Sequence, residues 1–137
     1  MSQREFVPPF TDATAPYWDG TRNRQLMLQY CPACGRYVHH PREACPGCLS
    51  SALEWRASPG FGAVHAISVH YKPFEVMSAE ECPYAVVFID LDEGVRFLAN
   101  VTADGPLEGI DVGDRVRLGW REVGGGYHVP VFHAGGR

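Results

Sequence analysis

The sequence predicts a mainly β protein in which a short N-terminal helix and a small metal-binding ribbon precede a five-stranded β-barrel. Two patterns support this prediction. Two CxxC motifs lie within residues 31–48, and five later segments carry β-branched and aromatic residues with a rough period of two. The chain has 137 residues, of which 45% are hydrophobic and 20% are charged. This composition is typical of a globular protein, and the length fits about one domain.

Residues 1–24 are predicted to form an extended arm and a short helix. Pro, Thr, Asp and Ala are frequent in the first fifteen residues. Thr14 is a suitable helix N-cap, and Pro16 is tolerated in a first helical turn. Tyr17 and Trp18 are bulky for an arm surrounded by water, so we expect them at an interface with a partner protein. Internal packing between the arm, the ribbon and the barrel is the alternative.

Residues 25–57 are predicted to form a zinc ribbon, with a first strand over residues 25–30. Two CxxC knuckles brought together by a short hairpin can supply four thiolates to one tetrahedral metal ion. The predicted ligands are Cys31, Cys34, Cys45 and Cys48. Four thiolates leave no position for water, so the metal is expected to be structural zinc, with iron as the alternative.

Other residues near the cysteine motifs are assigned supporting roles. Gly35 and Gly47 suit the tight turns of the two knuckles. His39 and His40 are alternative metal ligands, although with four cysteines available we expect them at the surface or at an interface. Cys82 stands alone before a proline, which is more typical of a packing residue than of a nucleophile.

Residues 58–137 are predicted to form an OB-type barrel. The expected strands are 61–72, 84–91, 94–103, 114–123 and 127–134. Gly94 lies where a hairpin turn needs a positive φ, and the longest insertion follows the third strand, as in an OB fold. Another small β-barrel or a sandwich is the competing architecture. His65 and His70 should lie on opposite faces of the first strand by parity, in structural roles.

One face of a predicted strand carries several arginines. In residues 114–123 they alternate with apolar side chains, and an arginine of the preceding strand is expected to join them. Such a face can bind the phosphates of an acyl-CoA or an acidic partner surface, whereas an ordinary solvated face is the alternative. The candidate contacts are Arg96, Arg115, Arg117 and Arg121.

The connection between the first two barrel strands is unusually apolar. It contains Tyr71, Phe74 and Met77. An apolar loop must cover something, so we predict contact with a partner subunit or an acyl chain, folding over the barrel mouth being the alternative. The sequence has no paired-carboxylate, phosphate-loop or dinucleotide motif, and no catalytic residue is predicted.

Charge and hydropathy limit the partners. The net charge of −4 and the pI of about 5.8 argue against nucleic acid or an anionic membrane as the partner. The first residues lack the apolar segment of a secretory signal, and the longest apolar run is too short to cross a bilayer. These features predict a cytoplasmic protein, in which paired CxxC motifs bind metal rather than form disulfides.

The order of these motifs resembles a known family. The chain contains, in this order, "APYWDG", "LMLQYCPACGRYVHHPREACPGCLSSALEW", "GFGAVHAISVHYKPF", "CPYAVVFIDLDEGVRFLANV", "IDVGDRVRLGW" and "VPVFHA". This arrangement is similar to the acyl-CoA-associated zinc-ribbon plus OB-fold family, domain of unknown function 35, from about Tyr17 to Phe132. The resemblance implies an N-terminal helix and a rubredoxin-like ribbon followed by an OB barrel.

The resemblance also implies a partner. Proteins of this family associate with thiolase-fold proteins, namely acetoacetyl-CoA thiolases and lipid-transfer-protein-like aldolases that cleave steroid acyl-CoA side chains. There the thiolase-fold subunit supplies the chemistry, and the small subunit stabilises it and helps to enclose the CoA thioester. We therefore expect a non-catalytic accessory subunit with acyl-CoA at the shared interface. A nucleic-acid-binding module is the alternative, which the acidic chain disfavours.

Overall fold

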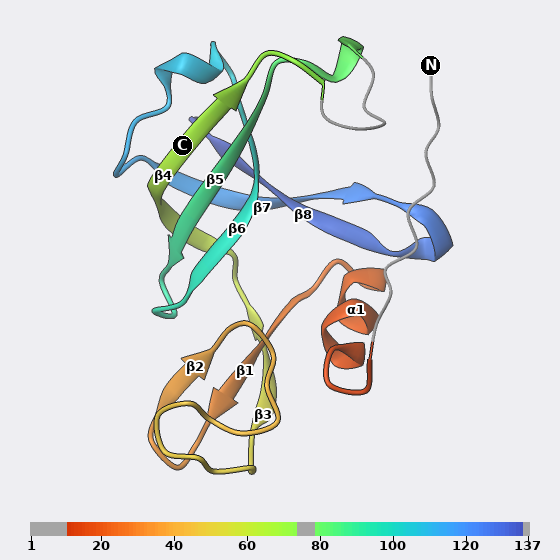
Figure 1. Ribbon diagram of the computed structural model, residues 1–137, viewed down its shortest axis with the longest axis vertical. Coiled ribbons are helices and arrows are strands. Elements are labelled where there is room, and N and C mark those ends of the chain that lie inside the picture. The colour runs from red at the N-terminus through yellow and green to blue at the C-terminus, as the bar shows by residue number, and fades with distance from the viewer. Residues whose placement is uncertain (1–10, 74–78, 136–137) are drawn as a thin grey trace.

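The computed structural model describes residues 11–73 and 79–135. A closed five-stranded barrel lies at one end of the molecule and a three-stranded ribbon at the other, with helix α1 beside them (Figure 1). The predicted mainly β fold is confirmed, and the closed barrel excludes the sandwich alternative. No helix among the described residues is long and apolar enough to cross a membrane.

Helix α1 (Ala15–Arg22) packs tightly against the ribbon. Thr14 occupies the predicted N-cap position, but its side chain makes no capping bond; its hydroxyl accepts a hydrogen bond from the amide of Thr11 (2.9 Å). A Cβ atom on Gly20 would lie 2.4 Å from Cγ of Met27. The absence of a side chain at Gly20 therefore allows the close contact between the helix and the ribbon.

The ribbon shares its interior with the barrel. Its strands are β1 (Leu26–Cys31), β2 (Arg36–Val38) and β3 (Glu54–Ser58), in the antiparallel order β2-β1-β3. Leu26 and Leu28 are buried and belong to the hydrophobic cluster of the barrel. The ribbon's own buried cluster consists only of Cys31, Val38 and Cys45 among the described residues. Such a small cluster cannot hold a ribbon together without a further crosslink.

The barrel has the strand order β4-β5-β6-β8-β7. Its strands are β4 (Phe61–His70), β5 (Tyr84–Leu91), β6 (Arg96–Ala103), β7 (Arg115–Glu122) and β8 (His128–Ala134). Strands β6 and β8 pair in parallel and the other neighbours are antiparallel. Short 3-10 turns lie at η1 (Ala79–Glu81), η2 (Leu107–Gly109) and η3 (Gly124–Gly126). The long insertion after the third strand contains η2.

A β-bulge in β4 changes which side chains face outward. The register with β5 shifts between residues 64 and 66. Beyond the bulge, His70 stacks on Tyr84 with 4.9 Å between ring centroids, while His65 lies 3.4 Å from the carboxylate of Asp90. Tyr84 and Asp90 share the outer face of β5, so both histidines lie outside the barrel. The parity prediction of opposite faces was wrong, because a bulge inserts one residue into the alternation.

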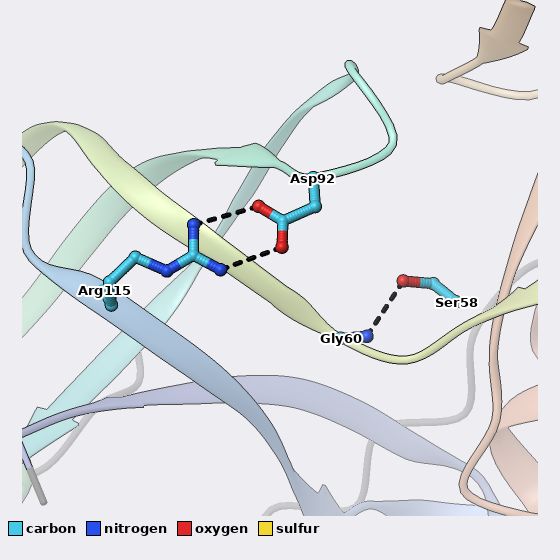
Figure 2. Close-up of polar contacts among 4 residues, drawn as sticks. All are labelled: Ser58, Gly60, Asp92 and Arg115. Carbon is cyan, nitrogen blue, oxygen red and sulfur yellow. Dashed lines mark hydrogen bonds and ion pairs between the residues drawn. The ribbon is translucent and has the colours of Figure 1, made fainter. Parts of the chain in front are cut away.

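A glycine joins the ribbon to the barrel. The amide of Gly60 donates a hydrogen bond to Oγ of Ser58 (3.0 Å), which closes the turn between β3 and β4 (Figure 2). Gly60 has φ +83°, and a Cβ atom there would lie 2.4 Å from Cβ of Leu118 in β7. Both the left-handed backbone and the close approach to β7 therefore require glycine.

The β7–β8 hairpin fixes the helix to the barrel. Nδ1 of the buried His128 donates to the carbonyl oxygen of Thr21 (2.8 Å), and the His128 amide lies 3.3 Å from the Thr21 hydroxyl. The guanidinium of Arg22 lies 4.1 Å from the centre of the Tyr127 ring. Helix α1 is thus held by the ribbon and by the barrel, and this orients Tyr17 and Trp18.

Candidate metal centre and apolar groove

The four predicted ligands converge at the end of the ribbon away from the barrel core. Their sulfur atoms all lie within 4.8 Å of one another, with 3.5 Å between Cys31 and Cys48 and between Cys34 and Cys45. A tetrahedron with metal–sulfur bonds of about 2.3 Å has sulfur–sulfur edges of roughly 3.8 Å. The residues present therefore fit one tetrahedral metal ion, and the cluster includes neither His39 nor His40.

The two knuckles have matching backbone geometry. The amide of Gly35 donates to the carbonyl of Cys31 (2.8 Å), and the amide of Leu49 donates to the carbonyl of Cys45 (2.8 Å). Both donors have a positive φ, +72° and +66° respectively. The prediction for Gly35 is confirmed, but the equivalent position in the second knuckle is Leu49. Gly47, predicted to serve that turn, does not have a positive φ, so its role differs.

A second feature is an apolar groove where the helix, the ribbon and the barrel meet. It has a volume of about 320 Å³. Its lining residues are Thr14, Tyr17, Trp18, His39, His40, Pro41, Phe97 and Leu98. The ring of Tyr17 lies edge-on to Trp18 (5.0 Å between centroids), and His39 packs on Phe97 (4.8 Å). The groove thus joins three segments that are far apart in the sequence.

The groove has little capacity to hold charge. Burial, and to a smaller extent the neighbouring His40, lower the pKa of His39 to about 4, so this ring is neutral at physiological pH. Burial also raises the pKa of Tyr17. The side chain of Gln29 fixes the adjacent loop, because Nε2 donates to the carbonyl of Arg42 (2.8 Å) and Oε1 accepts from its amide (2.7 Å).

The apolar character of the groove continues onto the outer face of the barrel. Leu98 lines the groove and remains 50% exposed, and it pairs across the strands with Phe88, which is 44% exposed. We call the groove together with Phe88 and Leu98 the apolar surface. An exposed surface of this kind is characteristic of a protein or ligand contact. Phe88 and Leu98 were not among the residues predicted from the sequence, although apolar residues at both parities of 84–91 indicate that both faces of this strand are apolar.

The predicted interface aromatics lie in two places. Tyr17 and Trp18 are half-buried; Tyr17 packs against the barrel core and Trp18 is edge-on to Tyr127 (6.4 Å). Tyr71 follows β4 at the end of the barrel away from the ribbon, is 61% exposed and donates a hydrogen bond to Glu108. Phe74 and Met77 lie outside the described residues, so the structure gives them no position.

Three of the four predicted arginines already have partners within the chain. Arg115 makes a bidentate ion pair with Asp92 (2.8 and 2.9 Å; Figure 2), and its hydrogen bonds hold the pKa of that carboxyl below its usual value. Arg96 makes a single contact with Asp90, from Nε to Oδ1 (2.8 Å), and this hydrogen bond lowers the pKa of the Asp90 carboxyl. Nη1 of Arg117 donates to a backbone carbonyl (3.1 Å).

Arg121 is the one of the four predicted arginines that has no ion pair or hydrogen bond within the described residues. The ion pairs of Arg96 and Arg115 are exposed, so they are weak and can be exchanged for contact with an anion. Their role in binding CoA phosphates stays a prediction.

Comparisons with known proteins agree with the two-part architecture. Residues 18–54 match the rubredoxin-like zinc ribbon domain of ChsH2, and residues 55–121 match the C-terminal OB-fold domain of ChsH2. The boundary between the two matches coincides with β3.

Two curated proteins are similar in sequence. One is a probable enoyl-CoA hydratase alpha subunit of Thermomonospora curvata, 32% identical over 91% of this chain. The other is the 3-oxo-4,17-pregnadiene-20-carboxyl-CoA hydratase alpha subunit of Mycobacterium tuberculosis, 31% identical over 80% of this chain. The chain spans about a third of these relatives, covering 38% and 34% of their length.

Two solved structures are similar in fold. A chain of the Ltp2-ChsH2(DUF35) aldolase has a TM-score of 0.82 and 29% identity, with 93% of this chain and 98% of that chain covered. A DUF35-family protein of unknown function from Sulfolobus solfataricus has a TM-score of 0.62 at 14% identity, covering 90% and 86% of the two chains, and shares the fold alone. With its zinc-ribbon and OB-fold domains both matched, the chain belongs to the ChsH2 (DUF35) family.

Proposed function

We propose that this chain is the small accessory subunit of a complex that processes acyl-CoA thioesters, and that its partner is a thiolase-fold aldolase or thiolase. The observation that carries the proposal is the similarity to the Ltp2-ChsH2(DUF35) aldolase, which extends over 98% of the matched chain at 29% identity. A relative of nearly the same extent is therefore part of a two-component enzyme. The name of the complex, an aldolase, supports carbon–carbon bond cleavage as the reaction of the assembly.

A hydratase complex is the second candidate. The curated relatives at 32% and 31% identity are alpha subunits of hydratases for CoA thioesters, one of them with a steroid-derived substrate. The similarity covers only 38% and 34% of those proteins, whereas it covers 98% of the aldolase chain. We therefore favour the aldolase, and we expect a CoA thioester of a steroid or another lipid as the substrate of the complex in either case.

We infer that the metal is zinc and that its role is structural. Cys31, Cys34, Cys45 and Cys48 supply four soft ligands with tetrahedral spacing, which is the preferred shell of structural zinc. Because this shell has no open position, the metal has no site for a reacting water molecule. Metal binding would instead crosslink a ribbon whose own buried cluster is very small.

We propose that the apolar surface faces the partner subunit. Half-exposed Leu98 and Phe88 provide contact area that the free chain leaves in water. Tyr17 and Trp18 form the floor of the groove beside them, where a partner side chain can be fully desolvated. Interface cores are depleted in charge and rich in aromatic residues, as this groove is. We expect the partner's substrate channel to open at this surface, so that the two subunits together enclose the acyl-CoA.

Co-expression tests the proposal. The chain should co-purify with a thiolase-fold protein from the same genome, and cleavage of the acyl-CoA substrate should require both proteins. The complex is detected by size-exclusion chromatography with light scattering, and the products by mass spectrometry. If the chain instead assembles only with a hydratase component, and no thiolase-fold protein binds it, the aldolase assignment is wrong and the second candidate replaces it.

A further inference from the structure

Gly47 lies in the second knuckle, and the reason for glycine there is a neighbouring side chain. A Cβ atom at Gly47 would lie 2.8 Å from both Cζ and Nη1 of Arg36 and 3.1 Å from its Nε. Contacts below 3.0 Å essentially never occur for real Cβ atoms. Since Gly47 does not have a positive φ, its backbone does not demand glycine. The missing side chain instead leaves room for the guanidinium of Arg36 to rest on the turn between Cys45 and Cys48.

The position of Arg36 is set by the backbone of the first knuckle. Arg36 begins β2 and pairs directly with Cys31 across the two strands. Its side chain therefore starts beside one knuckle and ends against the other. On the second knuckle, the amide of Gly47 donates to Sγ of Cys45 (3.3 Å), so the guanidinium lies on the same short turn that contacts a thiolate.

The metal-bound site is negatively charged, so a positive guanidinium beside it is favourable. Four thiolates around one divalent ion carry a net charge of −2. Amide donors such as that of Gly47 offset only part of this charge. Residues 31–48 contain two arginines, Arg36 and Arg42. Both arginines are exposed, but they are anchored differently: the guanidinium of Arg36 lies against Gly47, whereas Arg42 is held through its backbone by the side chain of Gln29 on β1.

We propose that Arg36 is the built-in counter-ion of the metal centre and that Gly47 is the position that admits it. Arg36 does not ligate the metal; it lowers the free energy of the anionic, metal-bound state and so slows loss of the ion. An arginine suits this role because its guanidinium is always charged and presents a planar face to the turn. The inference goes beyond the accessory role proposed above and depends on neither the partner nor the substrate.

A chelator competition on the full-length zinc-loaded chain tests the proposal. Zinc transfer to a coloured chelator is followed over time for the wild type, Arg36→Gln and Arg36→Lys, with Arg42→Gln as the matched loss of one ribbon charge. Arg36→Gln should release zinc faster by up to about fivefold, the upper end of what one exposed ion pair contributes. Arg42→Gln should release it at the wild-type rate. Raising the salt concentration should accelerate release from the wild type more than from Arg36→Gln, because salt screens the pair.

A second variant tests the geometry without removing the charge. Gly47→Ala keeps Arg36 but displaces its guanidinium, so it should also release zinc faster, and Arg36→Gln combined with Gly47→Ala should add little. In the cobalt-substituted protein, the thiolate-to-cobalt absorption should keep its intensity in all variants, since the four ligands remain. Equal release rates for the wild type and Arg36→Gln, or an equal acceleration by Arg42→Gln, would overturn the proposal.

Discussion

Replacing Leu98 provides a direct test of the partner surface, because this side chain can be removed without disturbing the barrel core. Leu98 is 50% exposed on the outer face of β6. Full burial of a leucine is worth about 1.5–3 kcal/mol, so covering its exposed half on binding would contribute roughly 1 kcal/mol. We therefore predict that Leu98→Ala weakens the complex about fivefold, since 1.4 kcal/mol corresponds to a factor of ten.

A charged substitution should have a larger effect. Leu98→Asp would place a carboxylate against an interface core that contains no compensating cation in the groove lining. Leaving such a charge desolvated costs several kcal/mol, so binding should fall by roughly 100-fold or more. Because the position is half exposed in the free chain, the free energy of unfolding should change by less than about 1 kcal/mol in Leu98→Ala.

The assay is calorimetric titration of the partner subunit into each purified variant, with thermal melting of the free chain as the stability measurement. Val112→Asp is the matched control, since Val112 is an exposed apolar residue (68%) outside the apolar surface. Tyr17 and Trp18 are less suitable, because their half-buried rings also stabilise the fold. Wild-type affinity in Leu98→Asp, or a weakening by Val112→Asp instead, would refute the placement of the partner.

Four other predictions concern the metal, activity, the domain joint and pH. Cys31→Ser or Cys48→Ser should abolish metal binding and destabilise the ribbon; unchanged metal content in both variants would contradict the site. The isolated chain should not turn over acyl-CoA substrates. Turnover by the purified protein alone would contradict this prediction. The first variant to assay would then be Thr102→Ala, because His133 lies between the Thr102 hydroxyl (2.8 Å) and the Asp104 carboxylate (2.9 Å), an order of groups that can activate a nucleophile. Gly60→Ala should lower the free energy of unfolding by about 1–3 kcal/mol, measured by denaturant titration, because of its φ and its contact with β7. The pKa of His39 is about 4 in the folded chain and about 6.5 when unfolded, so the free energy of unfolding should fall as pH drops from 6.5 towards 4, by up to about 3 kcal/mol. His39→Gln should reduce this loss in thermal melts.

The metal site and the barrel were predictable because their determinants are local. Four cysteines in two CxxC motifs specify a tetrahedral site whatever the surrounding fold, and the β-branched and aromatic residues of 84–91 and 94–103 specify strands. The helix was likewise indicated by Thr14 and the following proline. Thr14 does not form the capping hydrogen bond that its position suggests, because its hydroxyl pairs with the amide of Thr11 instead.

The groove and the ion pairs were not predictable, because they depend on which distant residues meet. Leu98 and Phe88 become neighbours only through the register of β5 and β6, and His39 reaches Phe97 only when the ribbon packs on the barrel. The pairing of Arg115 with Asp92 arises in the same way across β4. The bulge in β4 has no signature in the alternation, so parity alone gave the wrong face for a histidine.

One loop connects the metal site to the apolar surface. Through this loop, a structural metal ion can affect the proposed binding of the partner. The loop that carries His39, His40 and Pro41 into the groove runs between the two cysteine motifs. It is held at one end by β2, beside the metal ligands, and at the other by the side chain of Gln29 on β1. Loss of the metal would release both knuckles and with them the β2 end of this loop, leaving Gln29 as its remaining anchor. The groove would then lose one of its three walls, so metal removal should weaken partner binding even while the barrel stays folded.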